Sequence, residues 1–179
     1  MRTAKEMAEY CKKNNTGTGF SKGQRLKHFK VVESNLQDDE EVLGCFCGIH
    51  NYKSMTEHSN NFGYAITNKR IILGQKKVMG ENVHIISRKN INDVAKSTGL
   101  AFGTITFDTI KETFNVRVEK KETDAIHTLL VHQLFNEDSP NTLTTEKSAV
   151  EQLKEYKELL DMDIITQEEF DAKKKDLLS

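Results

Sequence analysis

The hydrophobic pattern of the sequence changes period twice, and these two changes limit the folds that the chain can adopt. From Val42 to His50 the residues alternate with a period of two, which is typical of a β-strand. Before this segment, and again after about residue 122, apolar residues recur at helical spacing. The sequence therefore predicts a β-domain with helices before and after it.

Segments rich in β-branched and aromatic residues continue to Val118, separated by Gly, Asn or charged turns. Thr67 to Arg70 has turn chemistry and predicts a hairpin between the segments on either side. The only proline, Pro140, lies beyond all of these segments. Because proline has no backbone N–H, its absence from the expected strands leaves every strand residue able to donate a hydrogen bond to a neighbouring strand. We expect about seven antiparallel strands, at residues 42–50, 62–66, 71–74, 83–87, 91–97, 103–109 and 112–118.

Three helices are expected around this sheet. The first, at residues 3–12, has one weakly apolar face, and the third, at 122–135, can cover an open sheet. The second spans residues 21–36, because Ser21 and Gln24 have the spacing of a capping box. Its apolar face consists of Leu26, Phe29, Val32 and Leu36, and that of the first helix consists of Ala4, Met7, Ala8 and Cys11.

A polar segment containing the proline follows and predicts a linker before two further apolar helical stripes. We expect four parts: an N-terminal helix and hinge (1–20), a β-domain (21–136), a linker (137–146) and a helical hairpin (147–179). A hairpin of about 30 residues buries too little surface to be stable alone, so it needs a partner. That partner is its own β-domain, another protein or, as we prefer, a second copy. The expected interface residues are Val150, Leu153, Tyr156, Leu160, Phe170 and Leu177.

Two groups of segments resemble known families. FGYAITNKRIILGQKK (62–77) and GTITFDTIKETFNVRVEK (103–120) resemble the bacterial YokE-like pleckstrin-homology (PH) domains, and the tail from Ala149 to Ser179 resembles the short C-terminal domain called SHOCT. The resemblance implies an α+β fold, in which a PH-like, seven-stranded antiparallel open barrel is capped by a C-terminal helix. N-terminal helices precede this barrel, and a two-helix hairpin follows it. Neither family carries a recognised catalytic constellation, so the resemblance implies binding or self-association.

Composition narrows the partners and the compartment. The 26 Lys and Arg residues nearly cancel the 27 Asp and Glu residues, so nucleic-acid binding is not expected except through a local patch. Three cysteines, an odd number, fit a reducing compartment. The sequence shows no signal-peptide core and no apolar run long enough for a membrane helix. We therefore expect a cytoplasmic protein.

No catalytic or metal-binding constellation stands out, and we expect no enzyme activity, metal or cofactor. Cys45-x-Cys47-x-x-His50 has zinc-ligand residue types, but on a strand the two cysteines face away from the histidine. The loop Gly17–Gly23 matches no phosphate-binding spacing and predicts a hinge. The acidic run Asp38–Glu41 predicts a solvated turn.

Four cations make a candidate anion or lipid-headgroup site at the two ends of one hairpin strand: Lys69, Arg70, Lys76 and Lys77. The alternative is a plain solvated turn.

The leading hypothesis is a non-catalytic PH-like module that engages a protein partner or an anionic surface, with a tail that promotes oligomerisation. The first alternative is a peripheral anionic-lipid-binding protein. The second is a phage or mobile-element inhibitor or accessory protein that acts by occlusion, and a hydrolase is the most distant candidate.

Overall fold

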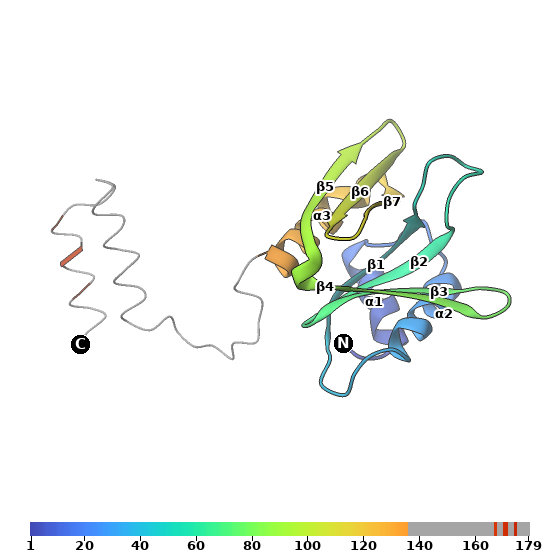
Figure 1. Cartoon of the computed structure of the whole chain (residues 1–179), viewed down its shortest axis with the longest axis horizontal. Coiled ribbons are helices and arrows are strands. Elements are labelled where there is room, and N and C mark those ends of the chain that lie inside the picture. Colours follow the sequence, from blue (N-terminus) through green and yellow to red (C-terminus); the bar gives the residue numbers. More distant parts are fainter. Residues whose placement is uncertain (136–166, 168–169, 172–173, 175–179) are drawn as a thin grey trace. The chain divides into compact units, whose positions relative to one another are not determined.

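The computed structural model describes residues 1–135 together with residues 167, 170, 171 and 174 (Figure 1). The chain divides into two compact units, Met1–Ser139 and Pro140–Ser179. In the second unit the four described residues are helical, and Phe170 is half-buried. The predicted linker lies outside the described residues, as do five predicted interface residues: Val150, Leu153, Tyr156, Leu160 and Leu177.

The first unit is built on a seven-stranded sheet, as predicted, with the order β4-β3-β2-β1-β7-β6-β5 and antiparallel neighbours throughout. β1 and β7 pair only through Ile49 with Arg117 and His50 with Val116, so the two halves of the sheet separate beyond this point (Figure 1). The edge strands β4 and β5 do not pair, and the sheet is therefore not closed. The strands are β1 (Val42–His50), β2 (Asn61–Thr67), β3 (Arg70–Lys76), β4 (Glu81–Ser87), β5 (Ile91–Thr98), β6 (Phe102–Thr109) and β7 (Thr113–Glu119).

Helices cover both faces of the sheet, and capping fixes where two of them begin. α1 (Ala4–Asn14) and α2 (Lys22–Glu33) each start with a capping box, formed by Thr3 with Glu6 and by Ser21 with Gln24. α2 ends at Glu33, earlier than predicted. The side chains of Ser34 and Asn35 donate hydrogen bonds to backbone carbonyls of the preceding turn, and these bonds compete with continuation of the helix. α3 (Thr123–Phe135) closes the domain, and two short 3₁₀ turns are η1 (Arg88–Asn90) and η2 (Lys120–Glu122).

Two apolar cores result, one on each face of the sheet. The inner core lies between the two halves of the sheet and α3, and it includes Phe46, Tyr64 and Phe107. The outer core lies where α1 and α2 pack on β1, β2 and β3, and it includes Phe29 and Ile72. All four residues of the predicted α1 face are buried in it, which confirms the predicted amphipathic helix: Ala4, Met7, Ala8 and Cys11.

Candidate functional site

The first pair of predicted anion-binding cations is engaged with the acidic run before β1. Arg70 donates from Nε and Nη2 to the two carboxylate oxygens of Glu40, both at 2.8 Å, and Lys69 Nζ lies 2.6 Å from Asp39. Burial opposes ionisation of the fully buried Glu40, but hydrogen bonds from Arg70 and Thr67 outweigh it and lower the pKa of this carboxyl. The prediction of a solvated acidic turn is therefore wrong for Glu40, which is one half of a buried ion pair.

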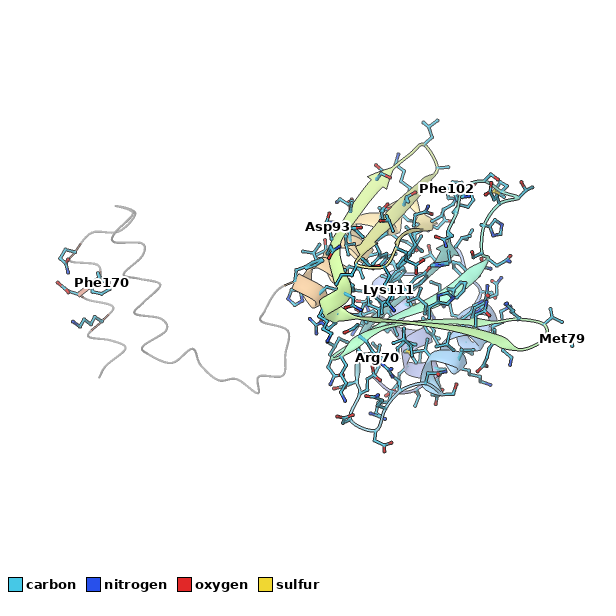
Figure 2. All side chains as sticks on the ribbon, in the orientation of Figure 1. Arg70, Met79, Asp93, Phe102, Lys111 and Phe170 are labelled. Carbon is cyan, nitrogen blue, oxygen red and sulfur yellow. The ribbon has the colours of Figure 1, made fainter. Side chains whose placement is uncertain are left out.

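The second pair lies at the opposite end of β3, as Figure 2 shows from the positions of Arg70 and Met79. Lys76 and Lys77 line a cavity of about 340 Å³ together with Lys27 of α2. Lys76 also faces Glu81 across the hairpin at 3.7 Å. The four predicted cations thus form two separate groups, and Lys27 extends the second group.

The hairpin tip beside this second group is apolar. Val78 and Met79 are almost completely exposed between β3 and β4, and Met79 points away from the body of the domain (Figure 2). Apolar side chains in water next to a group of lysines are an arrangement that suits contact with an anionic surface.

The possible zinc ligands lie on opposite faces of β1, which confirms the predicted orientation. Cys45 and Cys47 belong to the outer core, where Cys45 Sγ is 3.7 Å from Cys11 Sγ, and burial raises the pKa of both β1 thiols. His50 lies on the inner side, with Nδ1 2.8 Å from the hydroxyl of Tyr64. Within the described part of the chain, no three His, Cys, Asp or Glu side chains are grouped to hold a metal ion.

A pocket that sequence reasoning missed lies on the outer face of β7. It has a volume of about 200 Å³, and Arg117 lies in its wall with only 8% of its surface exposed. The guanidinium carbon of Arg117 is 4.1 Å from the ring centre of Tyr52 and 3.3 Å from that of Phe102. Both rings therefore lie against the guanidinium and make cation–π contacts with it. The pocket is lined by Gly19, Phe20, Ile49, Met55, Asn61, Phe102, Arg117, Val118, Glu119 and Glu122.

The N-terminal segment before α2 forms one side of this pocket and is held there by Glu122. The carboxylate of Glu122 is buried and accepts hydrogen bonds from the backbone N–H groups of Gly17 and Thr18 and from the Thr18 hydroxyl. Arg25 donates to the carbonyls of Gly17 and Phe20 from the other side. The predicted hinge at 17–23 is thus a fixed wall, and this segment places Gly19 and Phe20 against β7.

The sequence contained a partial signal for this site. Arg117 stands between the core residues Val116 and Val118, so strand alternation places it on the face away from the inner core. Its two ring partners, Tyr52 in the loop after β1 and Phe102 at the start of β6, lie about 65 and 15 residues away in the sequence, and no local pattern relates those positions to it.

Comparison with known families gives two matches. A family model described as a bacterial PH domain matches residues 36–130, more than half of the chain, and a model described as a short C-terminal domain matches residues 151–178. No curated protein matches the chain. The first match confirms the predicted PH resemblance and the second the predicted tail domain, while the narrower YokE-like assignment stays a prediction.

Proposed function

The chain belongs to the bacterial PH domain family, and from this premise we propose that it is a non-catalytic binding and assembly module. The PH domain engages a partner protein or an anionic surface, and the short C-terminal domain promotes self-association. Both families are typically non-catalytic modules of interaction, which supports this proposal.

The observation that carries the assembly role is the size of the second unit. Pro140–Ser179 is a compact unit of its own, yet a unit of about 40 residues rarely buries enough apolar surface for independent stability. Leaving its larger apolar side chains in water costs about 1.5 to 3 kcal/mol for each one. A second copy of the same unit supplies a complementary apolar surface, since a twofold contact uses the same stripe twice.

The test uses charged substitutions in the full chain. Leu153→Asp and Leu177→Asp place charges in the two predicted apolar stripes, and we expect the native mass in solution to fall to that of a single chain. Gln152→Asp is the matched control, because it adds the same charge beside the first stripe and should leave the mass unchanged. A wild-type chain that is monomeric at all concentrations would remove the self-association role.

A second candidate, peripheral binding to anionic lipid, is favoured by the exposed tip residues Val78 and Met79 beside Lys76 and Lys77. No helix among the described residues is long and apolar enough to cross a bilayer. Co-sedimentation with phosphatidylserine vesicles tests this candidate. Binding that is lost in high salt and in Met79→Asp would favour this candidate over a protein partner, and absence of binding at low salt would dismiss it.

The third candidate, an inhibitor or accessory protein of a phage or mobile element, rests on no particular residue of the described domain. The genes that neighbour its coding sequence are the observation that decides it.

A further inference from the structure

The unusual feature of the Arg117 pocket is a buried cation that forms no ion pair within the part of the chain that the structure describes. Within residues 1–135 its side chain makes one hydrogen bond, from Nη1 to the thioether sulfur of Met55 at 3.4 Å, and this sulfur is a weak acceptor. A guanidinium has five N–H donors in one plane, so Arg117 can still donate to a planar acceptor such as a carboxylate.

The plane of the guanidinium decides from which direction an acceptor can approach. The N–H groups of a guanidinium lie in its plane, so an acceptor approaches Arg117 edge-on while Tyr52 and Phe102 lie against the group. Edge-on approach is the geometry of a bidentate pair with a carboxylate, in which two parallel N–H groups meet two oxygens. The two rings also hold the guanidinium in one orientation, which reduces the entropy that a ligand loses on binding.

A second charged group, Glu119, faces the same pocket. It lies two residues after Arg117 on β7, so the two side chains share one face of the strand. Its carboxylate is half-buried and makes no hydrogen bond or ion pair within residues 1–135. The remaining acid, Glu122, already accepts three hydrogen bonds from the Gly17–Thr18 segment. Glu119 is therefore available to accept from an N–H group of a ligand.

Apart from Asn61, the rest of the lining is apolar or glycine, and the space is small. Phe20, Ile49 and Phe102 come from three different parts of the fold and border a volume of about 200 Å³. This volume suits one aliphatic side chain with its backbone atoms, and it is below the range of about 300 to 1,000 Å³ that is usual for drug-sized ligands.

We propose that this pocket binds an apolar amino-acid residue with a free α-carboxylate, which pairs with Arg117 while the neighbouring N–H group donates to Glu119. Such a residue occurs either as a free amino acid or as the C-terminal residue of a partner protein. This inference rests on the binding role proposed for the PH domain and is independent of the assembly role of the tail.

Three small ligands test the proposal on the full-length protein by isothermal titration calorimetry. N-acetyl-leucine mimics a C-terminal residue, leucine is the free amino acid, and N-acetyl-leucinamide lacks the carboxylate. We expect a Kd of about 1 mM or tighter for at least one of the first two, and binding at least about tenfold weaker for the amide. Tighter binding of N-acetyl-leucine indicates a protein C-terminus as the natural ligand, and tighter binding of leucine indicates the free amino acid.

Variants connect the binding to the two charged residues. Arg117→Gln should lose at least about tenfold in affinity, whereas Lys111→Gln, which removes an exposed cation between β6 and β7, should lose none. Glu119→Gln keeps the shape of the side chain, and this side chain makes no hydrogen bond within the described domain, so we expect the variant to fold. It therefore tests the site even if Arg117→Gln fails to fold. It should weaken the binding of leucine, whose ammonium group is charged, more than that of N-acetyl-leucine.

Three results would overturn the proposal: no binding of either carboxylate ligand, equal binding of the amide, or unchanged binding in both folded variants. None of these results changes the mass of the full chain, so they are distinguishable from a failure of the assembly role.

Discussion

At the scale of single residues, Lys69 and Arg70, two neighbouring cations at the start of β3, contribute very differently to the molecule. The Arg70–Glu40 pair is largely shielded from water, with 17% and 0% of the two side chains exposed, whereas Lys69 and Asp39 remain in contact with solvent. Burial makes the cost of breaking a pair large, because the remaining charge has no water to replace its partner.

Arg70→Met should therefore destabilise the fold by about 3 kcal/mol, since it leaves Glu40 buried and ionised without its partner. Lys69→Met should cost less than about 1 kcal/mol, as is usual for an exposed pair. Urea unfolding at neutral pH measures both values. Equal losses for the two variants would contradict the assigned difference in burial.

Two buried histidines make the stability depend on pH. Burial is the main cause that lowers the pKa of His28 and of His50 to about 4, with smaller contributions from Lys27 and His84. An unfolded chain protonates these residues at about pH 6.5. Stability should be complete above pH 6.5 and should fall between pH 6.5 and 4, where the unfolded chain binds protons that the folded chain does not.

The expected loss is at most about 1.4 kcal/mol per pH unit for each histidine. Comparing the free energy of unfolding at pH 7.5 and pH 5 isolates this effect, because carboxylates titrate mainly below that range. His28→Gln and His50→Gln should each reduce the difference, and the exposed His132→Gln should leave it unchanged. A stability that does not vary between these two pH values would refute the assignment of the buried histidines.

At the scale of the elements, close packing of α2 on β3 depends on Gly74. A β-carbon at this position would lie 2.9 Å from the carbonyl oxygen of His28 and 3.1 Å from the backbone nitrogen of Val32. Since both atoms belong to the helix backbone, only a shift of the whole helix would make room.

Gly74→Ala should therefore destabilise the domain by about 1 to 3 kcal/mol, the usual cost of overpacking. Gly23→Ala is the matched control within α2, because a β-carbon there meets no atom within 4 Å. It should be neutral or stabilise the fold by up to about 1 kcal/mol. Thermal unfolding of both variants checks this pair, and a neutral Gly74→Ala would show that the helix lies farther from the sheet.

Most of the elements followed from the sequence because their determinants are local. The apolar spacing of Ala4, Met7, Ala8 and Cys11 and the capping box of Ser21 with Gln24 involve residues within two or three turns of each other. The strands followed from alternation in the same way. The end of α2 did not, because it depends on the competing side-chain hydrogen bonds of Ser34 and Asn35.

The sites were harder to predict, since they depend on contacts between distant segments. Burial of Glu40 requires Arg70 from thirty residues away, and a pattern of four acids in a row gives no indication of it. The contacts of Tyr52 and Phe102 with Arg117 join one loop and two strands. Such an arrangement depends on the pairing of β6 with β7 and on the position of the loop after β1, which no single segment encodes.

At the scale of the whole molecule, we propose that the PH domain binds a partner and that the short tail promotes assembly. The two matched families occupy separate parts of the chain, and the division into two units lies between them. Such an arrangement lets a weak single-site interaction gain strength from several copies, because linked sites act at a raised effective concentration.

The most direct test is sedimentation equilibrium of the full chain and of a chain that ends at Ser139, each over about a hundredfold range of concentration. The account predicts that the apparent mass of the full chain rises with concentration above that of one chain, while the shortened chain stays monomeric. If the ratio of apparent mass to the mass of a single chain were the same for both chains at every concentration, the proposed assembly role of the tail would be contradicted.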